Sequence, residues 1–142
     1  MLIQTDYIGE VEYSEEELIV FPEGIYGFED YTKFIIVGEL TKEFPFVWLQ
    51  SVEDEKVVFV LTDPFLFVEE YDFSLNEENV EKLQIAGQED LQVFGICVIP
   101  NEIKETTLNL KSPVVINANK RQGLQVILDE DWPYKHKLFQ KK

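Results

Sequence analysis

The chain has 142 residues and a mass of 16.6 kDa, close to the commonest size of a single domain. Apolar residues make up 45% of it, enough for a packed core despite a net charge of −16. One cysteine, Cys97, excludes an intramolecular disulfide, and one histidine, His136, excludes a metal site with several histidines. No apolar run approaches the roughly 20 residues of a membrane span, and no basic leader opens the chain. We therefore expect a cytoplasmic protein.

The charge is unevenly distributed along the chain. Residues 1–90 contain 23 acidic and 4 basic residues, whereas residues 91–142 contain 5 acidic and 8 basic residues. An acidic field of this kind repels nucleic-acid phosphates and attracts a basic protein, although acidity also serves solubility alone. The residues that we single out as electrostatic candidates for partner contact are Glu15, Glu16, Glu17, Glu69 and Glu70.

Short runs rich in Val, Ile, Phe and Thr alternate with Pro and Gly along the chain, a pattern typical of small β-barrels and sandwiches. The expected strands are Gln4–Tyr13, Leu18–Phe21, Phe34–Val37, Phe46–Ser51, Val57–Thr62, Leu91–Ile99, Thr106–Leu110, Val114–Ala118 and Gln125–Leu128. The last six are expected to pair two by two, and Gly123 to supply a positive φ in the final turn. The predicted class is mostly β, a small antiparallel β-barrel-like domain.

One segment has the pattern of a helix, near Leu75–Ile85. Ser74 followed by Glu77 fits a capping box, and Gly87 is a plausible end. The whole chain, residues 1–142, is predicted to be one domain, with a basic and mobile C-terminal tail from about residue 135 to residue 142.

The residues offer little for catalysis. Cys97 lies in an apolar predicted strand, which favours a buried and unreactive thiol, and His136 lies in the basic tail, which favours an exposed surface position. There is no glycine-rich phosphate loop, and the spacing of the carboxylates does not favour a paired-carboxylate enzyme. We expect neither catalysis nor a cofactor.

Two turn-like segments, Phe21–Phe28 and Thr62–Phe67, carry unusually many aromatic side chains. These rings either fold back to cap an open end of the barrel or form an apolar surface that binds a protein. The candidate partner-binding residues in the two segments are Ile25, Tyr26, Phe28, Phe65 and Phe67, with Asp63 and Pro64 shaping the second loop. Asn109 and Asn117 either stabilise turns or hydrogen-bond a partner.

An ordered set of motifs resembles the family of the flagellar assembly factor FliW. The motifs are Phe21–Glu29, Leu49–Ser51, Thr62–Phe65, Thr107–Leu110, Pro113–Asn117 and Gly123–Ile127, and the resemblance extends from the first strand to about Tyr134. It implies a β-barrel-like protein that binds flagellin in the bacterial cytoplasm. It also implies that the flagellin-free protein binds CsrA, an RNA-binding translational regulator, and relieves its repression of flagellin synthesis.

Two other classes of function remain open at this point. The aromatic content suits a barrel that binds a small ligand, and the many carboxylates leave room for an enzyme if a cleft places two of them about 5–9.5 Å apart. How CsrA is antagonised also stays open, because the acidic surface either covers the RNA site or binds elsewhere on the regulator. The resemblance favours a binding site outside the RNA-contacting core.

Overall fold

The computed structural model describes residues 1–5, 9–85 and 91–139. One α-helix, α1, covers Glu77–Leu83, and short 3-10 helices cover Glu15–Glu17 (η1), Pro64–Leu66 (η2) and Ile103–Glu105 (η4). The strands are β1 (Leu2–Thr5), β2 (Gly9–Glu12), β3 (Ile19–Val20), β4 (Lys33–Val37), β5 (Val47–Ser51), β6 (Val58–Thr62), β7 (Leu91–Val98), β8 (Thr107–Leu108), β9 (Val114–Asn117), β10 (Gln122–Gln125) and β11 (His136–Lys137).

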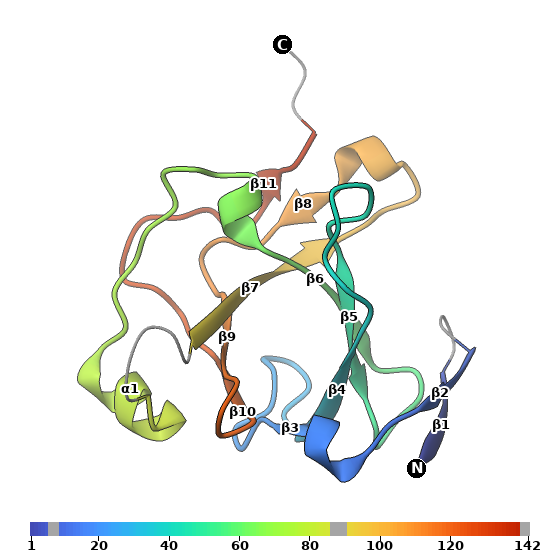
Figure 1. Ribbon diagram of the computed structural model, residues 1–142. Coiled ribbons are helices and arrows are strands. Elements are labelled where there is room, and N and C mark those ends of the chain that lie inside the picture. Colours follow the sequence, from blue (N-terminus) through green and yellow to red (C-terminus); the bar gives the residue numbers. More distant parts are fainter. Residues whose placement is uncertain (6–8, 86–90, 140–142) are drawn as a thin grey trace.

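Seven strands close into a barrel, which Figure 1 shows nearly end-on. Around the ring, β7 is followed by β6, β5, β4, β3, β10 and β9, and β9 pairs back to β7. The neighbours in this ring are antiparallel except β3 and β10, which pair in parallel through Val20 and Gln122. The predicted mostly-β barrel with one short helix is confirmed, while the parallel pair is a departure from the antiparallel arrangement.

The barrel wall separates two apolar clusters. Inside the barrel, Phe21, Phe34, Leu49 and Leu61 are fully buried with their neighbours. Outside β7, β9 and β10, a second cluster packs under the segment that leads to α1 and under the C-terminal segment; it includes Val68, Tyr71, Leu83, Cys97, Leu108, Leu110, Val115, Leu124, Val126 and Leu128. Side chains along a strand alternate between its faces, so β9 contributes Val114 and Ile116 inward and Val115 outward. All four residues of β9 are buried as a result.

The hairpin of β5 and β6 and the pairing of β7 with β8 confirm two of the predicted strand pairs. The third pair exists, but its second strand is Gln122–Gln125 and not Gln125–Leu128. Arg121, at φ 54°, supplies the left-handed residue of the turn. Gly123 lies within β10, so its predicted role in the turn was wrong.

The prediction of one long first strand, Gln4–Tyr13, was also wrong. The chain instead forms a separate hairpin in which β1 pairs antiparallel with β2. Gly9 begins β2 with φ +84°, a backbone conformation that favours glycine, and the Thr5 hydroxyl donates to the Gly9 carbonyl at 2.8 Å. This hairpin lies beside the barrel, on the side opposite α1 (Figure 1).

Helix α1 is confirmed within the predicted range but begins at a different cap. The Asn76 side chain, not that of Ser74, accepts from the backbone N–H of Asn79 at 2.8 Å. The backbone N–H of Ser74 donates instead to Glu130, which fixes Ser74 to the C-terminal segment. Gln84 ends the helix with φ 54°, and the predicted end at Gly87 lies outside the described residues.

The C-terminal segment is not a free tail over its described length. His136 and Lys137 form β11, opposite Leu108 and Thr107 of β8. His136 is half-buried there, and the backbone N–H of Leu138 donates to the Thr106 carbonyl at 3.1 Å. Residues 136–138 therefore continue the sheet outward from β8, within the range in which the sequence predicted a tail.

Gly123 is required by a close contact inside the barrel. A Cβ atom at this position would lie 2.4 Å from the Phe21 ring, which is itself fully buried. We expect Gly123→Ala to lower the free energy of unfolding by about 1–3 kcal/mol, as overpacking of a core does, in urea denaturation. Phe21→Leu in the same chain should recover part of this loss, and losses that simply add would contradict the steric explanation.

Candidate protein-docking groove

The Asp63-Pro64 motif ends strand β6 and turns the chain away from the barrel wall. The Asp63 carboxylate accepts from the backbone N–H of Phe65 at 2.9 Å, and Pro64 occupies the first position of η2. Proline has no N–H to give to a neighbouring strand, so the β6–β7 ladder stops at Thr62. Phe65 and Leu66, which follow at once, are 43% and 60% exposed.

Three surface hollows adjoin this turn and share lining residues. The first, about 490 Å³, lies between the β4–β5 loop and η2 and is lined by Leu40, Thr41, Lys42, Pro45, Asp63, Leu66 and Phe67. The second, about 310 Å³, is lined by Leu40, Asp63, Phe65, Leu91, Gln92, Val93 and Phe94. The third, about 390 Å³, reaches α1 and is lined by Phe65, Asp72, Phe73, Ser74, Leu75, Val80, Ile85, Leu91 and Val93. We call these three joined hollows the β7 groove.

Tyr71 holds the outer wall of the β7 groove against the barrel. It is 3% exposed, and its hydroxyl donates to the Leu110 carbonyl at 2.7 Å. Its ring lies 5.5 Å from that of Phe65 and 4.9 Å from that of Trp132, measured between centroids. Burial raises the pKa of Tyr71, so its hydroxyl stays a hydrogen-bond donor. Phe65 is thus exposed on a fixed support.

The groove is apolar at its floor and acidic at its rim. Asp63 and Asp72 line it, and Glu69 and Glu70 are exposed on the segment between them. Of the residues that line the three hollows, Lys42 alone is basic. An exposed apolar surface with a polar, mostly acidic rim is a feature of protein-binding sites.

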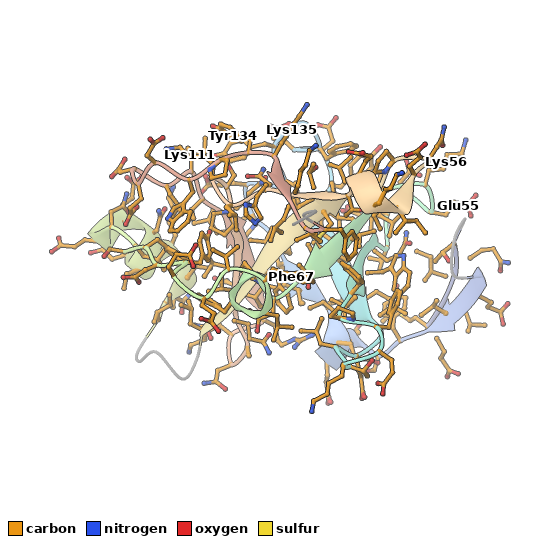
Figure 2. All side chains as sticks on the ribbon, turned by 90° about the horizontal axis from the view of Figure 1, so that it is seen from above. Glu55, Lys56, Phe67, Lys111, Tyr134 and Lys135 are labelled. Carbon is orange, nitrogen blue, oxygen red and sulfur yellow. The ribbon has the colours of Figure 1, made fainter. Side chains whose placement is uncertain are left out.

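Two lysines of the C-terminal third, Lys111 and Lys135, lie apart from η2. In Figure 2, Lys111 and Lys135 lie with Tyr134 along one edge, whereas Phe67 lies in the middle of the face, beside η2. The Lys111 ammonium donates to the Glu130 carbonyl at 2.8 Å. The Glu130 carboxylate in turn accepts from the backbone N–H of Ser74, which lines the third hollow, so Lys111 meets the groove only at its α1 end.

The first aromatic segment divides into a buried and an exposed part. Ile25 is 1% exposed and belongs to the barrel core, so its prediction as a partner-binding residue was wrong. Tyr26 and Phe28 are 55% and 41% exposed, and the Phe28 ring packs edge-on against Phe59 at 5.1 Å. Phe28 thus packs back onto the barrel while Tyr26 and Phe28 both stay exposed, and neither residue lines the β7 groove.

The second segment contributes Asp63, Phe65 and Phe67 to the groove. Pro64 is buried beneath the turn. Of the acidic candidates, Glu69 and Glu70 lie near the groove, while Glu15, Glu16 and Glu17 form η1, where Glu17 accepts from the backbone N–H of Ser14. Sequence reasoning missed Leu40 and Val93, since only the pairing of distant strands brings them to Phe65.

Asn109 and Asn117 both hydrogen-bond backbone groups at turns, as one of their two alternatives predicts. The Asn117 side chain is buried, donates to the carbonyls of Leu83 and Gln84, and accepts from the backbone N–H groups of Asn119 and Lys120. It thereby ties the end of α1 to the β9–β10 turn. Asn109 accepts from the backbone N–H of Ser112 at 2.9 Å.

Cys97 does not line the groove. Cys97 is buried, as predicted, and burial raises the pKa of its thiol to about 12. Across residues 1–5, 9–85 and 91–139, no three His, Cys, Asp or Glu side chains are grouped so that they could hold a metal ion. No helix in the described part of the chain is both long and apolar enough to span a membrane.

Comparison with known proteins gives one consistent result. Residues 2–138 match the family described as FliW protein. The chain belongs to the FliW family. It is 50% identical to the flagellar assembly factor FliW of Alkaliphilus metalliredigens, over 92% of this chain and 81% of that protein. It is 47% identical to that of Caldicellulosiruptor saccharolyticus, over 98% of this chain and 91% of that protein.

A solved structure supports the same assignment for the fold. The crystal structure of a flagellar assembly factor FliW is 37% identical in sequence and superimposes with a TM-score of 0.92. The match covers 100% of this chain and 99% of that one. The FliW family therefore accounts for the barrel as well as for the ordered motifs.

The hydrogen bonds of Asn117, which tie α1 to the barrel behind the groove, can be tested by substitution. We expect Asn117→Ala to lower the free energy of unfolding by about 2–4 kcal/mol in urea, because several buried backbone groups lose their partner together. Asn109→Ala, which removes one half-buried hydrogen bond, is the matched control and should cost about 1 kcal/mol. Equal losses for the two variants would contradict the bridging role of Asn117.

Proposed function

We propose that this chain is a flagellar assembly factor that acts in the cytoplasm by binding proteins and not by catalysis. In this proposal it binds flagellin and, when free of flagellin, binds CsrA and relieves the repression of flagellin synthesis. Membership of the FliW family supports the first part, since its matched members are named flagellar assembly factors. The partners themselves come from the family resemblance of the sequence.

The single observation that carries a binding function is the β7 groove. It joins exposed apolar side chains, Phe65 and Leu66 among them, into one surface on a rigid barrel. The barrel interior is filled by apolar side chains such as Phe21 and Phe34, which does not favour a small-ligand barrel. Partner binding at the groove is thus the function that this geometry supports best.

The acidic surface suits the RNA-binding partner in particular. Proteins that bind RNA carry lysines and arginines that neutralise phosphates, and a negative field speeds their encounter with this chain. Glu69 and Glu70, beside the groove, contribute to the association rate more than to the dissociation rate. We propose that the chain holds CsrA outside its RNA-contacting core and weakens RNA binding from there.

A competition experiment tests the exchange of partners. The chain is titrated by calorimetry with flagellin from its own source, with CsrA, and with CsrA after saturation by flagellin. We expect a stoichiometric complex with each partner and no binding of CsrA to the flagellin-saturated chain. Binding of flagellin alone would remove the translational branch from the proposal, and binding of neither protein would overturn it.

Phe65 tests whether the groove is the binding surface. We expect Phe65→Ala to weaken partner binding at least tenfold in the same titration, because large aromatic side chains supply much of the energy of protein interfaces. Ile103→Ala is the matched control, since Ile103 is 69% exposed but lies on η4, away from the groove. A folded Phe65→Ala chain that binds as tightly as the unaltered protein would contradict this assignment.

A further inference from the structure

Strand β7 has one edge along which its pairing with other strands is incomplete. On one edge it pairs with β9 over Leu91–Phe94 and with β8 over Cys97 and Val98. On the other edge it pairs with β6 only over Gly95–Cys97. If β6 continued in this register, Asp63 would lie opposite Phe94 and Leu66 opposite Leu91. The turn at Pro64 diverts these residues into η2, as the chain leaving β6 in Figure 1 shows.

The direction of the backbone groups can be assigned along this edge. The Ile96 carbonyl accepts from the backbone N–H of Asn109 at 2.9 Å, so the backbone N–H and C=O groups of Ile96 point toward β8 and β9. Alternate residues of a strand direct their N–H and C=O groups to the same side. The backbone N–H and C=O groups of Gln92 and Phe94 therefore face β9. Those of Leu91 and Val93 face the edge that β6 leaves open. Within residues 1–5, 9–85 and 91–139, no strand pairs with Leu91 or Val93 across that edge.

The 310 Å³ hollow runs along this open edge. It is lined by four consecutive residues of β7, Leu91 to Phe94, whose side chains alternate between the two faces of the strand. A hollow that touches both faces lies beside the strand and not over it. Its opposite wall is made by Leu40, Asp63 and Phe65. An unpaired strand edge beside an apolar wall is a template for another strand.

We propose that an extended segment of the RNA-binding regulator adds to the barrel as a further strand beside Leu91–Phe94. This inference rests on the proposed function and states how that partner is held. The main chain of the segment bonds to the N–H and C=O groups of Leu91 and Val93. Its apolar side chains pack against Leu40 and Phe65, and a lysine or arginine pairs with Asp63.

The acidic residues of the groove favour a basic segment of an RNA-binding protein as the added strand. Asp63 and Asp72 line the groove, and Glu69 and Glu70 lie between them in sequence, so an added segment that carries basic residues meets an attractive rim. An RNA-binding protein supplies such residues. A helix seated in the same groove satisfies its own backbone and leaves the amides of Leu91 and Val93 unbonded, so the two modes of binding differ in an observable way.

Amide hydrogen exchange, followed residue by residue by NMR, distinguishes them. The probe is purified CsrA from the same source, added to the full chain until saturation. In the free chain we expect Leu91 and Val93 to exchange fast, and Gln92 and Phe94 to be protected by β9. In the complex we expect Leu91 and Val93 to slow at least tenfold. Flagellin, used as the comparison partner, should not produce this alternating protection.

A pair of variants tests the same edge without relying on spectra. Val93→Pro removes one N–H from the open edge, and this N–H is not one that bonds to β9. Val93→Thr keeps the N–H and a similar shape, and is the matched control. We expect Val93→Pro to weaken CsrA binding at least tenfold and Val93→Thr to weaken it less than threefold, with thermal unfolding confirming that both chains are folded.

The outcomes separate the two proposals. A CsrA complex in which Leu91 and Val93 exchange as fast as in the free chain overturns strand addition and leaves the proposed function standing. The same holds if flagellin, and not CsrA, protects these amides. Failure of the unaltered chain to bind CsrA overturns the translational branch and strand addition with it. If Val93→Pro does not fold, the exchange pattern of the unaltered chain decides alone.

Discussion

The pairing of Leu91–Phe94 with β9 is the interaction on which the rest of the structure depends, because it closes the barrel. Closure buries the inner face of β9 against Phe21 and Phe34 and its outer face against the cluster around Tyr71. The segment from Asp63 to α1 then packs on this outer cluster, and Phe65 is presented at its edge. One side of the groove is thus formed by the strand that closes the fold. A site on such an element keeps its geometry when a partner binds.

Local patterns were enough for the elements whose causes are local. Short apolar runs predicted the β5–β6 hairpin, and the capping-box pattern predicted a helix in the segment that contains α1, although Asn76 provides the cap. Where the cause lies elsewhere in the chain, the prediction failed. Gly123 was assigned to a turn on its local pattern. The constraint on Gly123 is instead its close contact with Phe21, which lies about a hundred positions earlier in the chain, and no local pattern reveals it. The prediction of a single first strand failed because a glycine inside a strand pattern, such as Gly9, is also compatible with a break between two strands of a hairpin.

Only the part of the candidate site that is continuous in sequence could be predicted. Asp63, Pro64 and Phe65 were found because a turn motif and exposed aromatics adjoin in sequence. Leu40 and Val93 complete the groove from two other elements, and nothing local marks them. Ile25 was assigned to the surface with its aromatic neighbours, but a tight bridge from Ile25 to Phe28 directs it inward. Composition identifies an apolar turn, and only packing decides which of its side chains stays outside.

Three parts of the groove contribute different things to recognition. The acidic field acts at long range and sets how often a basic partner arrives, while salt screens it. Main-chain bonds along an open strand edge give affinity with little regard to sequence, because every residue but proline offers the same groups. The choice among extended segments therefore falls to the side chains that face the edge, Leu40, Phe65 and Asp63. Changes at these three residues alter which segment is preferred, whereas a change to the backbone of Val93 alters affinity for every segment that adds as a strand.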